Sequence, residues 1–167
     1  MIRKINPIDS INGDITIPPS KSFSQRVAAC ALISKERTII HNFGCSSDEK
    51  TSLEILKNST KKISSNNNTI TIGESTTISF KKNEISFNES GLSSRLFTPI
   101  LATLSNKLKL LGSGSLLNRP MELFDEILPQ LGINFQSSNG KLPFTITGPI
   151  VPTSIHIDGS LSSQFIS

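Results

Sequence analysis

The sequence predicts an α/β (α+β) protein built from repeated β-α-β-α-β-β units of about 70 residues each. A short motif recurs three times, and its last residues, Arg26, Arg95 and Gln164, are spaced 69 residues apart. The helical segment LEIL at 53–56 also resembles DEIL at 125–128, and each precedes a strand-like run, TITIG or FTITG. A fixed period of this kind indicates a repeat architecture. The chain therefore contains roughly two copies of the unit and the start of a third.

The first unit, residues 19–88, follows a strand-like segment that two prolines end. Serine caps and an apolar run through Ile33 predict one helix, and the capping-box spacing of Ser46 and Glu49 predicts another. The low-complexity segment ISSNNNT at 63–69 is typical of a loop tip. The expected strands lie at 13–17, 37–43, 69–73, 76–80 and 84–87.

The second unit, residues 89–157, repeats this pattern. One helix is expected over 93–104, with Pro99 inside it. A second helix is expected over 120–131, because proline suits a first helical turn and Gly132 suits a C-terminal cap. GSGS between these helices is typical of a turn. The expected strands lie near 107–111, 133–136, 143–147 and 153–157.

The third unit, residues 158–167, stops where the first two units have a buried helix. Such a helix is needed to cover the apolar face of the neighbouring strands. We therefore expect the sequence to be an incomplete fragment of a longer protein. An unusual natural terminus is the alternative interpretation.

The composition indicates a globular protein, with 35% hydrophobic and 18% charged residues among 167. The longest apolar stretch, Val27–Ile33, is far shorter than the roughly 20 residues that a membrane-spanning helix needs. The N-terminal MIRKINPIDS lacks the apolar core of a secretory signal. We therefore expect a cytoplasmic protein with no membrane partner.

A net charge of +4 favours anionic partners. Nucleic acid is not expected among them, because the basic residues are scattered and no stacking aromatics are interleaved with them. Cys30 and Cys45 have no metal-ligand spacing and no nearby histidine in a ligand pattern. We expect two free thiols, with Cys30 in a helix core, and no metal site.

The recurring helix starts are candidate anion sites. The first turn of a helix carries unpaired N–H groups and a partial positive charge, and serine hydroxyls and basic side chains add to both. The candidates are Lys21, Ser22 and Arg26 in the first unit, and Ser162, Ser163 and Gln164 in the third. The alternative is that the serines only cap helices and the charges are solvated, so that the recurrence reflects a duplicated fold rather than a ligand.

Four motifs resemble the N-terminal part of the EPSP synthase (3-phosphoshikimate 1-carboxyvinyltransferase) family, which belongs to the enolpyruvyl transferases. They are PPSKSFSQR at 18–26, GLSSRLF at 91–97, NRPMELFDEILPQLG at 118–132 and DGSLSSQF at 158–165. The family fold has two lobes of three β-α-β-α-β-β units each, with the substrates between them. The resemblance implies that residues 1–18 carry a first strand belonging to the other lobe. Residues 19–167 would then form an incomplete lobe that binds shikimate 3-phosphate, and the missing second lobe would be its partner.

The resemblance also implies an activity. The family transfers the enolpyruvyl group of phosphoenolpyruvate to the 5-hydroxyl of shikimate 3-phosphate and releases phosphate, without a cofactor, in the shikimate pathway to chorismate and the aromatic amino acids. The isolated chain is expected to be inactive, because other acid/base carboxylates and cationic ligands of the family lie in its later half. Lys21 is implied to contact both substrates and to be catalytic. The implied shikimate 3-phosphate ligands are Lys21, Ser22, Arg26, Ser162, Ser163 and Gln164, and the implied phosphoenolpyruvate ligands are Lys21, Gly91, Arg119 and Gln164.

Some residues depart from the family pattern. Pro19 stands where the family has glycine, Glu89 brings a negative charge to the phosphoenolpyruvate side, and Leu92 removes a hydroxyl there. One alternative function is a UDP-N-acetylglucosamine enolpyruvyl transferase, although that enzyme typically has Lys-Asn in place of Lys21-Ser22. The other is a non-catalytic anion-binding fragment. A nucleic-acid-binding module is a more distant alternative.

Overall fold

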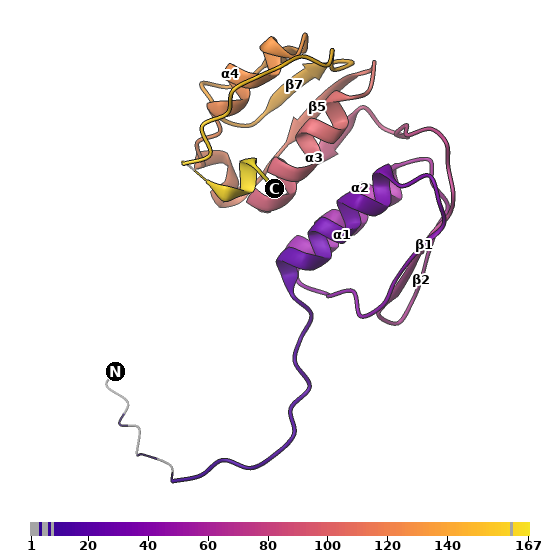
Figure 1. Cartoon of the computed structure of the whole chain (residues 1–167), viewed down its shortest axis with the longest axis vertical. Helices are drawn as coiled ribbons and strands as arrows, with labels where there is room; N and C mark the ends of the chain where they lie inside the picture. Colours follow the sequence, from indigo (N-terminus) through magenta and orange to yellow (C-terminus); the bar gives the residue numbers. More distant parts are fainter. Residues whose placement is uncertain (1–3, 5–6, 8, 161) are drawn as a thin grey trace.

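The computed structural model describes residues 4, 7, 9–160 and 162–167. Two α/β units lie side by side, and the helices α1, α2 and α3 meet between their sheets (Figure 1). An extended N-terminal segment runs away from both units, whereas the C-terminal residues return to the start of α3 (Figure 1). The predicted α/β class is confirmed.

The first unit consists of two helices and a three-stranded antiparallel sheet. Its sheet has the order β1-β3-β2, and β1 pairs with β3 so that Ile40 lies opposite Ile70. Alternation along β3 buries Ile70 and Ile72 beneath the helices. The elements are α1 (Lys21–Ile33), β1 (Thr38–Ile40), α2 (Ser47–Asn58), β2 (Ile63–Asn66) and β3 (Thr69–Ile72).

The second unit repeats this order and adds one strand. Its sheet has the order β4-β5-β7-β6, in which β4 runs parallel to β5 and the other pairs are antiparallel. The three strands β5-β7-β6 therefore match β1-β3-β2 of the first unit. The elements are β4 (Glu84–Ser86), α3 (Gly91–Ala102), β5 (Lys107–Leu111), η1 (Gly114–Asn118), α4 (Leu123–Gln130), β6 (Asn134–Gln136) and β7 (Phe144–Thr147), followed by η2 (Ser163–Phe165).

Several expected strands are absent from the described part of the chain. Residues 13–17 and 153–157 form no ladder, and within 76–80 only Phe80 makes a bridge, to Ser59. These segments have the alternating pattern of a strand, but a strand also needs a neighbouring edge to pair with. In the described part of the chain neither 13–17 nor 153–157 pairs with such an edge.

The predicted loop tip at 63–69 is confined to a two-residue turn, because the rest of the segment belongs to a β-hairpin. Strand β2 and strand β3 flank a two-residue turn, Asn67-Asn68. Asn67 has a φ of 49°, and asparagine tolerates this left-handed conformation better than most residues. The three asparagines that suggested low complexity include the two that make the turn.

The helices follow their sequence signals closely, with shifted starts. Helix α3 begins at Gly91 rather than Ser93, and α4 begins at Leu123 because η1 and an extended stretch precede it. Gly132 ends α4 as expected: its φ is 75°, and the next N–H, of Ile133, donates to the Leu128 carbonyl at 3.1 Å. This is the Schellman arrangement that glycine favours.

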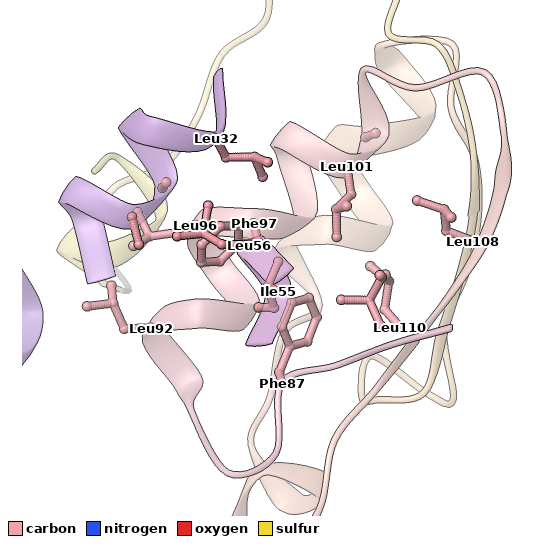
Figure 2. Close-up of a cluster of buried hydrophobic side chains, with 14 of the residues drawn as sticks. Leu32, Ile55, Leu56, Phe87, Leu92, Leu96, Phe97, Leu101, Leu108 and Leu110 are labelled. Carbon is pink, nitrogen blue, oxygen red and sulfur yellow. The ribbon is translucent and has the colours of Figure 1, made fainter. Parts of the chain in front are cut away.

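The core lies where the three helices meet the sheets. Figure 2 shows leucine, isoleucine and phenylalanine side chains from α1, α2, α3, β5 and the end of β4 in one cluster. Phe87 and Phe97 are fully buried at its centre. The expectation that Cys30 belongs to this core is wrong. Cys30 and Ile33 lie on the solvent face of α1, whereas Ala28 and Leu32 face inward, so both cysteines are free and exposed.

The start of α2 is fixed by the predicted capping box. The Ser46 hydroxyl accepts the Glu49 N–H at 3.4 Å, and the Glu49 carboxylate accepts the Ser46 N–H at 3.0 Å and its hydroxyl at 2.6 Å. Burial raises the pKa of Glu49, but the hydrogen bonds from Ser46, aided by Ser24 and the charge of Lys21, outweigh it and hold that pKa below its ordinary value. The ionised form is therefore favoured by folding.

We expect Glu49→Ala to lower the free energy of unfolding by about 1 kcal/mol at neutral pH, because it removes one half of the capping box. Glu49→Gln keeps a side-chain oxygen that can accept hydrogen bonds, but it has no carboxylate charge that protonation could remove. Folding lowers the pKa of Glu49. The stabilisation that its ionised carboxylate gives the folded state is therefore complete above the unfolded-state pKa, and it is lost as pH falls through the folded-state pKa.

Urea unfolding between about pH 6 and pH 3 checks this prediction. The original chain should lose stability more steeply than Glu49→Gln over this range. Glu126→Gln, which removes an exposed carboxylate from the first turn of α4, is the control. Parallel pH curves for the original chain and Glu49→Gln would contradict the assignment.

Candidate functional site

Three helices and the C-terminal turn η2 border one cleft of about 400 Å³. It lies at the N-terminal ends of α1, α2 and α3, on the side where the C-terminus returns to the body (Figure 1). Five of the sequence-predicted site residues line it: Lys21, Ser22, Gly91, Arg119 and Gln164. Its other lining residues are Gln25, Ser47, Asp48, Glu89, Leu92 and Ser115.

Each helix start at the cleft is set by a serine cap. Ser20 accepts the Phe23 N–H and thereby starts α1 at Lys21. Ser90 accepts the Ser93 N–H at 3.2 Å and starts α3 at Gly91. The N-terminal ends of these helices have unpaired N–H groups and partial positive charge, which favour anions. The cleft therefore combines several helix ends with basic side chains.

Lys21 forms an ion pair across the cleft mouth. Its Nζ lies 2.8 Å from Oδ2 of Asp48, which joins α1 to the first turn of α2. The Lys21 side chain is 55% exposed, so solvent screens the pair and its net contribution to stability is small. An anionic ligand can therefore take the place of Asp48 beside Lys21 at little cost.

Gly91 and Arg119 line the opposite wall, and Arg95 lies close to Gly91. A Cβ on Gly91 would lie 2.5 Å from Nη1 of Arg119 and 3.2 Å from Nη1 of Arg95. Glycine is therefore required for the guanidinium of Arg119 to approach the start of α3. The same approach brings the positive charges of Arg119 and Arg95 close together. An anion bound between the two guanidinium groups would reduce their repulsion.

Arg95 supports this wall through two lining residues, although no sequence motif assigned it to the site. Its Nη1 donates to the Gln164 side-chain oxygen at 2.9 Å and to the Gly91 carbonyl at 3.3 Å, and its guanidinium carbon lies 5.0 Å from the Phe165 ring centre. Burial, and then the charge of Arg119, lower the pKa of Arg95 below its ordinary value. Arg95 and Gln164 occupy the same repeat position, so the 69-residue period was the signal that could have paired them.

Glu89 introduces a negative charge beside these arginines. Its carboxylate accepts the backbone N–H and the hydroxyl of Ser115, both at 3.2 Å. A Cβ on Gly114 would lie 2.4 Å from the carboxyl carbon, and Gly114 has a φ of 52°, so glycine is needed there on both counts. Glu89, which departs from the family pattern, is thus accommodated by η1, and its negative charge stays at the cleft.

Three predicted site residues do not line the cleft. Arg26 donates to the Ser22 carbonyl at 3.2 Å and to the hydroxyl of Ser167 at 2.8 Å, so it ties α1 to the C-terminal residues. Ser162 caps η2 by accepting the Gln164 N–H at 3.3 Å, and Ser163 is exposed. Arg26 and Ser162 flank the cleft through their contacts with Ser22 and Gln164.

A buried polar network holds the helix starts together. The side-chain oxygen of Gln25 accepts the hydroxyls of Ser90 at 2.8 Å and Ser93 at 2.9 Å. The Ser93 hydroxyl also lies 3.0 Å from that of Ser52, and the Gln25 amide donates to the Lys21 carbonyl at 3.3 Å. All four side chains of the network are buried. Movement of one helix would leave polar groups unpaired, so the network fixes α1, α2 and α3 relative to one another.

Neither a metal-binding cluster nor a membrane-spanning helix is found in the described residues. No three His, Cys, Asp or Glu residues within 9–160 and 162–167, or at 4 and 7, are grouped as a metal site. In the same part of the chain no helix has the length and apolarity to span a bilayer.

The chain matches the family described as EPSP synthase (3-phosphoshikimate 1-carboxyvinyltransferase) over residues 5–167. It belongs to the EPSP synthase family. A 3-phosphoshikimate 1-carboxyvinyltransferase from Clostridium kluyveri is 32% identical over 163 residues, which cover 98% of this chain and 38% of that protein. The chain therefore spans a little over a third of the length of this relative.

Solved structures support the same fold. An EPSP synthase from Acinetobacter baumannii superposes with a TM-score of 0.78 at 24% identity, covering 92% of this chain and 36% of that one. The enolpyruvyl transferase NikO from Streptomyces tendae gives a TM-score of 0.55 at 14% identity. The match covers 84% of this chain and 33% of that one. At these identities the likeness concerns the fold, and the fold does not separate one enolpyruvyl transferase from another.

We expect Gly91→Ala to weaken phosphate binding at the cleft about tenfold, because the added Cβ displaces the Arg119 guanidinium and removes a charge-assisted hydrogen bond. Titration of the labelled chain with inorganic phosphate, followed by amide NMR shifts, measures this. Gly73→Ala is the matched control, since its Cβ would meet Lys62 at 3.3 Å, outside the cleft. Equal affinity in Gly91→Ala and the original chain would contradict the role of Gly91.

Proposed function

We propose that this chain supplies the shikimate 3-phosphate side of an enolpyruvyl transferase active site. The longer protein would transfer the enolpyruvyl group of phosphoenolpyruvate to the 5-hydroxyl of shikimate 3-phosphate. The observation that carries the proposal is that Lys21, Ser22, Gly91, Arg119 and Gln164 border one cleft, in a chain of the EPSP synthase family. These residues come from segments far apart in the sequence.

The cleft suits two anionic substrates. Lys21 lies at the start of α1 and can reach from Ser22 toward the α3 side, so its charge would stand between the two ligands. The serine hydroxyl and the N-terminal end of α1 would hold the phosphate of shikimate 3-phosphate through charge-assisted hydrogen bonds. Arg119 and the start of α3 would hold phosphoenolpyruvate. Positive groups placed before the reaction stabilise charge that develops in the transition state.

The negative residues of the cleft would act unequally on the two ligands. Asp48 is paired with Lys21 and is displaced when a phosphate takes that position. Glu89 is held by Ser115 beside the arginine wall and stays there. We therefore infer that this chain discriminates against phosphoenolpyruvate more than against shikimate 3-phosphate.

Two alternatives are kept for specific reasons. The likeness to NikO concerns the fold alone, so it leaves room for another enolpyruvyl transferase, including one acting on UDP-N-acetylglucosamine. The Lys21-Ser22 pair favours shikimate 3-phosphate over that substrate. The coverage of only 38% of the Clostridium kluyveri relative favours a second candidate, an anion-binding fragment without turnover. The proposed division is a first strand in 1–18 for another lobe and a binding lobe in 19–167, and location in the cytoplasm stays a prediction.

Titration with shikimate 3-phosphate tests the proposal, with unphosphorylated shikimate as the control ligand. We expect saturable NMR shifts at the amides of Lys21, Ser22 and Gln164 with the phosphorylated ligand and none with shikimate. In the same titration Lys21→Met should raise the dissociation constant about tenfold or more, because a charge-assisted contact is lost.

Lys50→Met is the matched control for Lys21→Met. Lys50 is an exposed lysine on α2 that does not line the cleft, so its loss changes the net charge equally. A similar weakening by both variants would show a general charge effect rather than a contact by Lys21. Equal shifts with shikimate and its phosphate would contradict the proposed function itself.

Arg119→Ala should act on phosphoenolpyruvate rather than on shikimate 3-phosphate. Its guanidinium lies against Gly91, on the α3 side of the cleft. We expect the dissociation constant of phosphoenolpyruvate to rise about tenfold or more and that of shikimate 3-phosphate to change less than about twofold. Isothermal titration calorimetry with each ligand measures both values. An equal loss for the two ligands would argue against this assignment.

A further inference from the structure

Arg95 is anchored to the start of its own helix. Its Nη1 donates to the carbonyl of Gly91, one turn earlier in α3, at 3.3 Å. The first unit has the same contact, because Nη1 of Arg26 donates to the Ser22 carbonyl at 3.2 Å. The two arginines, and the two residues that accept from them, are each 69 residues apart. The repeat therefore fixes an arginine side chain along the first turn of both helices.

The guanidinium of Arg95 is also held from the side of the C-terminal turn. Its central carbon lies 5.0 Å from the ring centre of Phe165, a distance at which a cation and an aromatic face attract each other. The Phe165 ring packs in turn against Phe124, with 5.2 Å between the ring centres. Nε of Arg95 is buried and has no hydrogen-bond partner among the described residues. Arg95 does not line the cleft, so a hydrogen bond to a ligand there must come from a neighbour.

Gln164 is that neighbour. A glutamine side chain has an acceptor, Oε1, and a donor, Nε2, on one amide, whereas a guanidinium has donors only. Nη1 of Arg95 therefore selects Oε1, at 2.9 Å. Nε2 of Gln164 donates to none of the residues that the structure describes, and Gln164 lines the cleft. The two N–H bonds of the amide are thus left for a ligand of the cleft.

The opposite orientation of this amide would change the character of the cleft. A half-turn about the last side-chain bond of Gln164 would place Nε2 against the Arg95 guanidinium, so that donor meets donor. It would also present Oε1 to the ligand, and an acceptor repels an anion. Hydrogen bonds that involve a charged group are the stronger ones, so Arg95 keeps the amide in the first orientation.

We propose that Arg95 is a positioning residue, which holds the Gln164 amide with its N–H bonds toward the cleft and thereby makes this wall selective for oxyanions. Arg95 acts through Gln164 and makes no contact with the ligand itself. The inference rests on the proposed function in one respect, the anionic character of the ligand. It adds to that function the reason why an amide, which has both a donor and an acceptor, acts here as a donor.

Titration of the isotope-labelled chain with inorganic phosphate, followed by NMR at the side-chain amides, tests the orientation. We expect the Nε2 signals of Gln164 to shift and saturate together with the backbone amide of Lys21. Gln136 is the internal control, because it is exposed on β6 and does not line the cleft. In Arg95→Met the Nε2 signals of Gln164 should lose this response, since no donor then holds Oε1.

The strength of phosphate binding gives a second, independent measurement. Arg95→Lys keeps the positive charge but lacks the planar guanidinium whose Nη1 reaches Gly91 and Gln164 together. We expect it to raise the dissociation constant of phosphate about fivefold. In a chain that also carries Gln164→Ala, Arg95→Lys should change that constant less than about twofold, because the amide that it would release is absent. Arg37→Lys, at an exposed arginine outside the cleft, is the control and should leave the constant unchanged.

Three results would overturn the proposal. One is a Gln164 side chain that does not respond to phosphate, whether or not the Lys21 amide does, and the original chain reveals this without any variant. Another is an unchanged dissociation constant in Arg95→Lys beside a weakened Arg95→Met, which would show an effect of charge alone. The last is an equal effect of Arg95→Lys with and without Gln164→Ala. The proposed function fails on a different result, equal shifts with shikimate and its phosphate, so the two can fail separately.

Discussion

Three helices direct their positive ends toward one cleft, and the structure depends on the hydrogen bonds that keep them there. Like partial charges repel, so this arrangement needs compensation. Gln25 provides it by accepting from Ser90 and Ser93 at once, while Ser93 contacts Ser52 on α2. Next to this layer of buried polar side chains, the apolar faces of the same helices pack together (Figure 2). The cleft therefore rests on a polar layer directly above the hydrophobic core, and both layers set the same helix positions.

The repeat gives equivalent residues different roles. Arg26 holds the C-terminal residues, Arg95 is half buried against Phe165, and Gln164 accepts a hydrogen bond from Arg95. A contact between two equivalent positions of neighbouring units is what a symmetric arrangement of units produces. The three residues therefore differ in their place at the cleft, because Gln164 lines it and Arg26 and Arg95 do not.

Most of the fold follows from local signals in the sequence. The capping box at Ser46, the glycine cap at Gly132 and the 69-residue period depend on residues close together or on repetition, so a single sequence is enough to find them. The prediction of strands at 13–17 and 153–157 was wrong, because strand pairing depends on partners that are distant in the sequence. The hairpin at Asn67 was missed because asparagine runs indicate turns and disorder alike. Sequence motifs were enough to predict Lys21 and Arg119 as residues of the cleft. The contacts of Arg95 behind it, and of Glu89 with Ser115, depend on the tertiary structure and could not be predicted.

The contact between Gln164 and Arg95 also orders events in time. A ribosome releases the chain from its N-terminus, so α1, α2 and α3 can pack and bury their apolar faces before residues 162–167 emerge. The wall that Gln164 contributes to the cleft is completed only when those residues fold back onto α3. During synthesis the hydrophobic core around these helices can therefore form before Gln164 reaches the cleft.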